Sequence, residues 1–339
     1  MKIDSCRGEI VECIRIPGID FETRKSWNDR LFYYEHKLFF LPDYNRRIIC
    51  VDLLNDKAIR YIDYPENIKY TLNPVILKND NIFIFPYDGK DVFAFDMREE
   101  KWMNKSLFES NIKLSRHCFE RANNVILTEI DSNRVWIFDL CTNEIICHFI
   151  GESTSNIEAA ILQQNSIYAI KCDNAEVLQY DIQRKRVVKT KKLPGAYRFV
   201  PHWAFGLVMR GGNFIYAFPQ NGNMILKIDI DLQSIENSFS NSNFESGFDE
   251  NGNAISEVLD APVCLDDNIV YAFSTLENDW RVFNIKENTT LNFEIAEGMS
   301  GDVKKEIEDV FSDEFFKTVV NEGAFFSLER YITKVIESI

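Results

Sequence analysis

Four histidines are the residues of this chain best suited to acid–base chemistry near neutral pH, where an unperturbed imidazole changes its charge. They are His36, His117, His148 and His202. No two of them stand at a metal-binding spacing such as His-x-x-x-His, and the chain contains no nucleophilic-serine, phosphate-loop or dinucleotide motif. The residue types therefore predict no cofactor and no metal site, and leave only chemistry assembled from distant parts of the chain.

Such an assembled site is the enzymatic alternative. His117 or His202 would act as the general acid or base, and Arg116 would bind an anionic part of the substrate. Carboxylates that could pair with either histidine are Asp29, Glu158 and Asp260. A lyase or hydrolase acting on a polar substrate, such as a sugar or peptide, would need one of these pairs within hydrogen-bond reach in an open pocket.

Eight cysteines could bind metal or form disulfides, but none belongs to a Cys-x-x-Cys pair. They are Cys6, Cys13, Cys50, Cys118, Cys141, Cys147, Cys172 and Cys264. Several fall within or beside apolar runs, which favours buried free thiols in a reducing compartment. The first residues contain no apolar stretch long enough for a signal peptide, and no run approaches the roughly 20 apolar residues of a membrane-spanning helix. We therefore expect a cytoplasmic protein that does not enter a membrane.

The elements that would position these residues are visible in the stretch Asn81–Met97. Two runs rich in β-branched and aromatic residues, Ile82–Phe85 and Val92–Phe95, flank the dipeptide Asp88-Gly89. Runs separated by Asp-Gly predict an antiparallel hairpin, because the turn needs the positive φ that Gly accepts readily. Both runs are apolar on successive residues, which predicts a sheet covered on both faces.

This hairpin recurs about six times along the chain. The paired runs are Leu38–Pro42 with Ile48–Asp52, Ile82–Phe85 with Val92–Asp96, Val125–Glu129 with Val135–Asp139, Ile167–Lys171 with Val177–Asp181, Phe214–Pro219 with Ile225–Asp229, and Ile269–Ser274 with Trp280–Asn284. Consecutive second runs end 44, 43, 42, 48 and 55 residues apart, and a break residue always stands ten residues before that end. With a further run before and after each hairpin, each unit supplies four short strands at a period of about forty to fifty residues.

A period of that length with four strands per unit resembles the β-propellers of the kelch, WD40 and quinoprotein-like repeat superfamilies, over roughly residues 8–296. The resemblance implies an all-β fold, a six-bladed β-propeller of four-stranded antiparallel blades, with a seven-bladed one as the alternative. Most units lack the Gly-Gly pair of kelch repeats, and the Trp-Asp and Gly-His dipeptides of WD40 blades do not recur. The resemblance therefore implies a fold and carries over no family's active site.

In a propeller the innermost strand of each blade begins at the mouth of a central channel. Counting thirteen residues back from each break residue gives the residues expected there, which are Asp29, Asn73, Arg116, Glu158, Gly206 and Ala261. Nearby in sequence are His117, His202, Trp203 and Asp260. A ring of mixed charge with aromatic groups predicts a site for a polar ligand. The alternative is that these positions are solvated strand starts, and that carboxylate–arginine pairs among them hold the blades together.

The two ends of the chain depart from the repeat. The segment Glu9–Ile16 predicts a strand that closes the last blade, so that the propeller would cover residues 1–298. From Gly301 onward apolar residues follow helical spacing, and we expect residues 299–339 to form a helical extension packed on the propeller. A net charge of −15 argues against nucleic acid as a partner, despite the basic run Arg184–Lys192 on an outer strand.

Together these patterns favour a non-catalytic binding or scaffold propeller that recognises a protein or glycan partner. The missing local motifs and the helical extension support this interpretation over the enzymatic alternative. The sequence leaves open the identity of the ligand, the face of the propeller that binds it and the oligomeric state.

Overall fold

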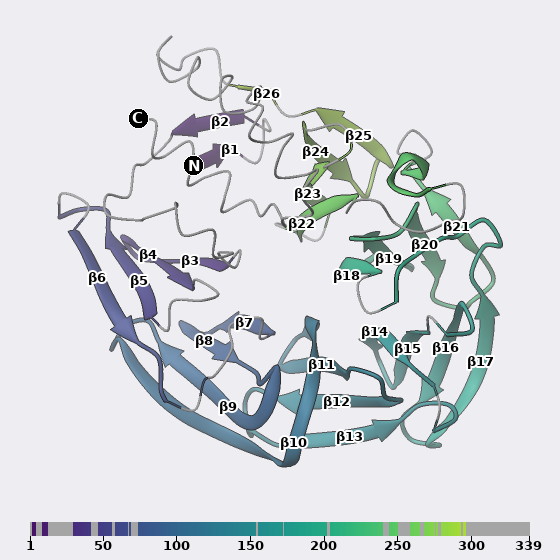
Figure 1. Cartoon of the computed structure of the whole chain (residues 1–339), viewed down its shortest axis with the longest axis horizontal. Coiled ribbons are helices and arrows are strands. Elements are labelled where there is room, and N and C mark those ends of the chain that lie inside the picture. The colour runs from purple at the N-terminus through teal and green to yellow at the C-terminus, as the bar shows by residue number, and fades with distance from the viewer. Residues whose placement is uncertain are drawn as a thin grey trace.

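The described fold is all-β. A computed structural model of the chain describes residues 2–4, 9–12, 30–41, 47–55, 58–66, 68, 74–153, 155–171, 173–201, 204–239, 244–249, 258–264, 268–274, 276, 279–292 and 294–295. These residues form strands β1 to β26 and one short 3-10 helix, η1 (Glu245–Gly247). The sheets stand in a ring around a common axis (Figure 1). Within those ranges no helix is long and apolar enough to cross a membrane.

Four sheets have four antiparallel strands that pair in the order of the sequence. The first contains β3 (Arg30–Tyr34), β4 (Lys37–Leu41), β5 (Arg47–Asp52) and β6 (Ala58–Asp63). The next contains β14 (Ile157–Gln163), β15 (Ser166–Lys171), β16 (Glu176–Asp181) and β17 (Arg186–Lys192). It is followed by β18 (Phe205–Gly211), β19 (Phe214–Pro219), β20 (Ile225–Asp229) and β21 (Ile235–Ser238). The last contains β22 (Leu259–Cys264), β23 (Ile269–Ser274), β24 (Asp279–Asn284) and β25 (Thr289–Asn292).

Two further units are joined into one seven-stranded sheet by the long strand β10 (Lys101–Arg121). The other strands of this sheet are β7 (Val75–Lys78), β8 (Asn81–Ile84), β9 (Asp88–Asp96), β11 (Asn124–Glu129), β12 (Arg134–Asp139) and β13 (Ile145–Phe149). The first part of β10 pairs with β9 and its last part pairs with β11, so β10 is the outer strand of one unit and the inner strand of the next. Figure 1 shows this strand turning from the rim toward the axis. Its 21 residues contain neither Gly nor Pro, the residues that most often interrupt a strand.

All six hairpins predicted from the sequence are confirmed, as the pairs β4–β5, β8–β9, β11–β12, β15–β16, β19–β20 and β23–β24. The turn predicted at Asp88-Gly89 is wrong, because both residues lie in β9, where they pair with β10, and Gly89 does not have a positive φ. The residue that closes each hairpin caps the turn that follows. The side chain of Asp139 accepts the backbone N–H of Cys141 at 2.7 Å and that of Thr142 at 2.9 Å. Residues in the same role are Asp52, Asp96, Asp181, Asp229 and Asn284. The recurring aspartate therefore fixes where the third strand of a unit ends.

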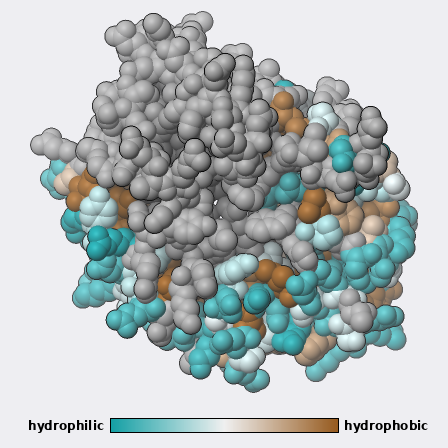
Figure 2. All heavy atoms as spheres, viewed as in Figure 1, coloured by the Kyte–Doolittle hydropathy of each residue, from teal (hydrophilic) through white to brown (hydrophobic). Residues whose placement is uncertain are grey.

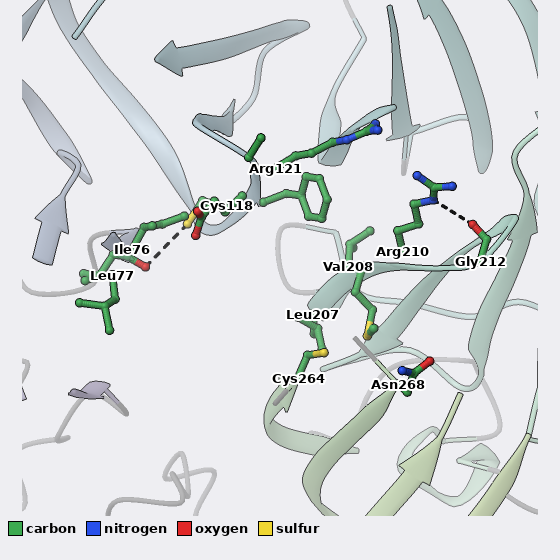
Figure 3. A pocket seen from close by; sticks show the side chains of 15 residues that line it. Ile76, Leu77, Cys118, Arg121, Leu207, Val208, Arg210, Gly212, Cys264 and Asn268 are labelled. Carbon is green, nitrogen blue, oxygen red and sulfur yellow. Dashed lines mark hydrogen bonds between the residues drawn. The ribbon is translucent and has the colours of Figure 1, made fainter. Parts of the chain in front are cut away.

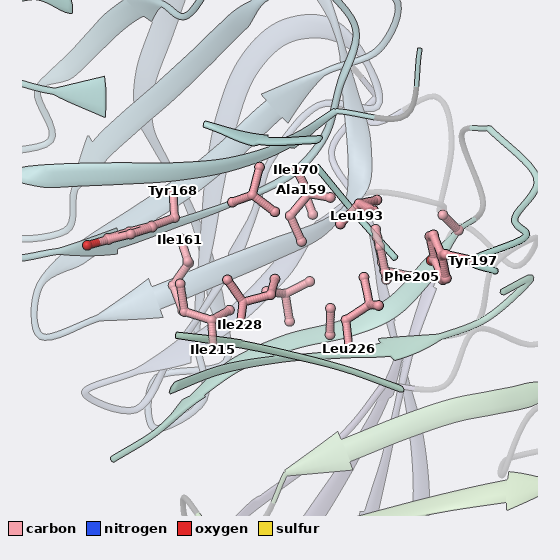
Figure 4. Packing of buried hydrophobic residues seen from close by; sticks show 14 of the residues in the cluster. Ala159, Ile161, Tyr168, Ile170, Leu193, Tyr197, Phe205, Ile215, Leu226 and Ile228 are labelled. Atoms are coloured by element: carbon pink, nitrogen blue, oxygen red, sulfur yellow. The ribbon is translucent and has the colours of Figure 1, made fainter. Parts of the chain in front are cut away.

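The hydrophobic core lies between consecutive sheets. In β8, Ile82 and Ile84 pack with the preceding sheet, whereas Phe83 packs with the following unit. There the rings of Phe85 and Phe138 meet edge to face at 5.2 Å between centroids. Figure 4 shows the same kind of packing between the β14–β17 and β18–β21 sheets. Burial on both faces confirms the prediction made from successive apolar residues, and explains why one unit cannot bury its core alone.

The first strands of the chain form a sheet of their own. This sheet contains β1 (Lys2–Asp4), β2 (Glu9–Glu12) and β26 (Glu294–Ile295), and β2 runs parallel to β26. It lies between the β22–β25 sheet and the β3–β6 sheet in Figure 1. A strand near the beginning of the chain thus pairs with β26, the last described strand, which follows the β22–β25 sheet in the sequence. The number of blades and the boundary at residue 298 stay predictions, and the expected helices of residues 299–339 lie outside the described residues.

The described outer surface is largely hydrophilic, as Figure 2 shows for one face. Exposed large hydrophobic residues are spread over several sheets and comprise Tyr33, Leu54, Tyr61, Leu77, Ile146, Phe149 and Val188. Scattered apolar side chains of this kind are normal on a protein surface.

Candidate functional site

A cavity of about 820 Å³ lies inside the ring, among the inner strands β7, β10, β18 and β22 (Figure 3). This volume falls within the roughly 300–1,000 Å³ typical of small-molecule sites. Apolar residues make up most of its wall, including Ile76, Leu77, Leu207, Val208 and Met209. The charged residues Glu120, Arg121 and Arg210 line it near the ends of the inner strands. A wall of this kind suits a ligand that has an apolar body and a polar group.

Two arginines of this wall share a single hydrogen-bond acceptor. Arg121 is the last residue of β10, and Arg210 is the residue before the end of β18. Both donate from Nη1 to the side-chain oxygen Oε1 of Gln163, the last residue of β14, over 2.8 Å for Arg210. Arg121 Nη1 also donates to the carbonyl oxygen of Leu162 at 3.0 Å, and Arg210 Nε donates to that of Gly212 at 2.8 Å. Figure 3 shows the two arginine side chains extending toward one another. Arg121, Gln163 and Arg210 are called the arginine cluster below.

The arginine cluster is a site of positive charge in an acidic chain, whose net charge is −15. Neither of its arginines forms a salt bridge with a described carboxylate, whereas the nearby Lys78 forms one with Glu120 at 2.7 Å. Burial lowers the pKa of the Arg121 guanidinium, and the positive charge of Arg210 lowers that pKa further. Gln163 is only 7% exposed. The buried, uncharged amide of Gln163 thus accepts hydrogen bonds from two cationic side chains.

The repeat register was used to predict site residues only at the starts of the inner strands, and the arginine cluster lies at their ends. Arg121 and Gln163 are the last residues of their strands, and each stands eighteen residues before the closing aspartate of its unit, Asp139 or Asp181. In β18 that position is Gly211, and Arg210 precedes it. The same register, counted to the strand ends, would have found these positions.

Glu158 is the one residue of the predicted channel ring that the structure describes with its side chain. It is 6% exposed, and its Oε1 accepts the backbone N–H of Ala204 at 3.1 Å. Its carbonyl oxygen accepts the hydroxyl of Thr128 at 3.4 Å. Ala204 directly precedes β18 and Thr128 lies in β11, so Glu158 connects its own sheet to both neighbours. These contacts join neighbouring sheets through a backbone N–H and a hydroxyl group, whereas the alternative expected carboxylate–arginine pairs. Both interpretations of the channel ring stay predictions.

The other predicted site residues are described in part or not at all. Arg116 and His117 lie in β10 and Asp260 lies in β22, and their side chains fall outside the described structure. Residues wholly outside it are Asp29, Asn73, His202 and Trp203. Their predicted role in binding a polar ligand stays a prediction.

Two histidines have described side chains, and neither lines the cavity. His36 Nε2 lies 3.5 Å from Asp52 Oδ1, beside the turn that this aspartate caps. His148 is buried in β13, where burial lowers the pKa of its imidazole and the charge of Lys185 lowers it further. Across the described residues, no group of three or more His, Cys, Asp and Glu could hold a metal ion.

Comparison with known proteins identifies the fold of this chain and no activity. The chain matches no protein-family profile and no curated protein. A solved streptogramin B lyase structure is 12% identical, with a TM-score of 0.56, over 84% of this chain and 87% of that chain. Virginiamycin B lyase from Staphylococcus aureus is 10% identical, with a TM-score of 0.54, over 83% of this chain and 88% of that chain.

At identities this low, a structural likeness shows a shared fold and no shared activity. The similar structures are propeller proteins, in agreement with the ring of sheets and the interfaces between them. No motif assigns the chain to one propeller family. We conclude that the chain is a β-propeller with four-stranded antiparallel sheets.

Proposed function

We propose that the chain is a non-catalytic binding propeller whose central cavity holds part of a protein or glycan partner. The observation that carries this proposal is the composition of the cavity wall, which is mostly apolar and has two arginines as hydrogen-bond donors. Its described lining contains one carboxylate, that of Glu120, which is in the salt bridge with Lys78. Such a wall can bind and orient a ligand, but its described residues include no histidine–carboxylate pair that could move the ligand's protons.

The enzymatic alternative, a lyase or hydrolase, would use the other end of the inner strands, with His117 or His202 as the acid or base. Of the carboxylates that could serve such a site, Glu158 already accepts the backbone N–H of Ala204. Two of the similar solved structures are lyases, but at 12% and 10% identity their activity does not transfer to this chain. These considerations favour binding over catalysis.

The proposal is tested by filling the cavity. Leu207→Trp adds a large ring to the cavity wall in β18, and the matched control Leu54→Trp adds the same ring to a turn where Leu54 is 74% exposed. The wild-type chain and both variants are applied to peptide and glycan arrays, and each selected ligand is then titrated by calorimetry. We expect Leu207→Trp to lose the binding that wild type and Leu54→Trp show.

Two results would contradict the proposal. Ligand binding that survives Leu207→Trp places the binding site outside the cavity. A ligand recovered with a changed mass after incubation with the wild-type chain shows that the protein is a catalyst. Circular dichroism and thermal unfolding of both variants establish that any loss of binding is not a loss of the fold.

A further inference from the structure

We infer that the arginine cluster binds an oxyanion, the carboxylate or phosphate group of a ligand whose apolar part lies against the cavity wall. This inference rests on the proposed function in one respect: the oxyanion would be the group by which the cavity orients its partner. It adds the chemical class of that group, which the fold and the comparisons leave open.

The first support is the number of arginine N–H groups for which the described residues supply no partner. A guanidinium has five N–H donors in a planar fork. Toward described residues, Arg121 donates only from Nη1, to Leu162 and Gln163, and Arg210 donates from Nε and Nη1. Nη2 of both side chains and Nε of Arg121 therefore have no hydrogen-bond partner in the part of the chain that the structure describes. A guanidinium edge matches the paired oxygens of a carboxylate or phosphate.

The second support is the arrangement of charge. Two guanidinium groups held by one amide oxygen repel each other, and partial burial weakens the solvent screening of that repulsion. Elsewhere around the cavity, Lys78 is neutralised by Glu120. An anion placed between Arg121 and Arg210 would relieve the repulsion and form charge-assisted hydrogen bonds with both side chains.

The third support is what lies beside the cluster. Leu207, Val208 and Met209 precede Arg210 in β18 and line the same cavity, with Ile76 and Leu77 of β7 also in its wall. A bare inorganic ion would leave this apolar wall in contact with water. An anion that carries an apolar group would bury part of the wall while its oxygens meet the arginines.

The test measures the binding of two simple probes to the full chain at constant ionic strength. Hexanoate and phenyl phosphate each join an oxyanion to an apolar group and distinguish a carboxylate ligand from a phosphate ligand, and hexanamide is the neutral control. Calorimetry gives the affinity and thermal unfolding gives the stabilisation. We expect at least one anion, and not hexanamide, to bind and to raise the melting temperature of the wild-type chain.

The variants identify the site. Arg121→Gln and Arg210→Gln each remove one charge, and we expect each to weaken probe binding by about tenfold or more, since a hydrogen bond to a charged group is worth at least that factor. Gln163→Glu keeps the shape of the cluster but cancels one of its two positive charges, and should weaken anion binding without lowering the melting temperature of the free protein. Lys189→Gln is the matched control, because Lys189 is exposed on the outer strand β17.

Several results would overturn the inference. They are failure of both probes to bind the wild-type chain, equal weakening by Lys189→Gln, and unchanged binding in Gln163→Glu or Arg210→Gln. If neither probe binds the wild-type chain, and array ligands still bind after Arg121→Gln but not after Leu207→Trp, the proposed binding function stands and the oxyanion site is rejected. If the probes bind at the arginine cluster while Leu207→Trp leaves array binding intact, the oxyanion site stands and the proposed function is rejected.

Discussion

Replacing Asp139 by alanine tests whether the recurring aspartate of each unit is a turn cap. Its carboxylate accepts the backbone N–H groups of Cys141 and Thr142 at 2.7 and 2.9 Å. The turn lies at the surface, so water replaces the lost acceptor and the cost stays below that of a buried donor left unpaired. The loss of a capping side chain typically costs about 0.5–2 kcal/mol. Because two bonds to a charged group are lost, we expect the free energy of unfolding to fall by about 1–2 kcal/mol.

Asp139→Asn is the matched variant, because the chain already uses asparagine at this position in its sixth unit. The side chain of Asn284 accepts the backbone N–H of Glu287 at 3.0 Å. An amide oxygen keeps the geometry and loses the charge, and hydrogen bonds to charged groups are roughly twice as strong as neutral ones. We therefore expect Asp139→Asn to cost roughly half as much as Asp139→Ala.

The effect of Asp139→Ala should also depend on pH. The N–H groups of Thr142 and Cys141 lower the pKa of the Asp139 carboxyl below its ordinary value of 3.8. A carboxyl with a depressed pKa in the folded state stabilises the fold fully above its unfolded pKa, and loses this contribution as pH falls through the folded pKa. Urea unfolding followed by tryptophan fluorescence should show the full difference at pH 7 and a shrinking one below about pH 4. A difference that does not change with pH, or an Asn variant as costly as the Ala variant, would refute the reasoning.

Three further substitutions or modifications follow from other parts of the fold. Phe138→Ala removes a fully buried ring from the interface between two units, and should lower the free energy of unfolding in urea by about 3–5 kcal/mol. A decrease below about 1 kcal/mol would contradict the burial of Phe138 at this interface. Lys185 has a backbone φ of 52°, which glycine adopts without strain, so Lys185→Gly should raise the free energy of unfolding by up to about 1 kcal/mol. Arg186→Gly is the control: it places glycine in strand β17, where its greater loss of conformational entropy should lower the free energy of unfolding. Burial raises the pKa of the Cys147 thiol to about 11, so iodoacetamide at pH 8 should alkylate the exposed Cys141 before Cys147. Mass spectrometry measures the two alkylation rates, and equal rates would be inconsistent with the burial of Cys147.

The hairpins were predictable because the signals that specify them are local. Alternation of apolar runs with turn residues determines a hairpin within about fifteen residues of sequence, and the capping aspartate lies in the same stretch. Burial of both faces was predictable for a related reason. Ile82, Phe83 and Ile84 are apolar in succession, and neighbouring residues of a strand point to opposite faces, so both faces need a cover.

The continuous strand β10 could not be predicted in this way. Its sequence shows where strand residues occur, but whether two strands are joined without a break depends on how two adjacent sheets stand relative to each other. The role of Glu158 was equally undetermined, because a carboxylate at a strand start can meet a ligand or a neighbouring backbone N–H. The structure adds that Glu158 accepts the backbone N–H of Ala204, the residue before β18 of the next sheet, and a role of its carboxylate in binding a ligand stays a prediction.

The sequence by itself determined the repeated unit, its hairpin and its need for neighbours on both sides, because each of these follows from the order of residues within one unit. Only the tertiary structure decided the arginine cluster. Arg121 and Gln163 are 42 residues apart, and Gln163 and Arg210 are 47 apart. Their side chains meet because the units close into a ring that brings the ends of successive inner strands together around one axis, and the curvature of that ring is set by packing between sheets.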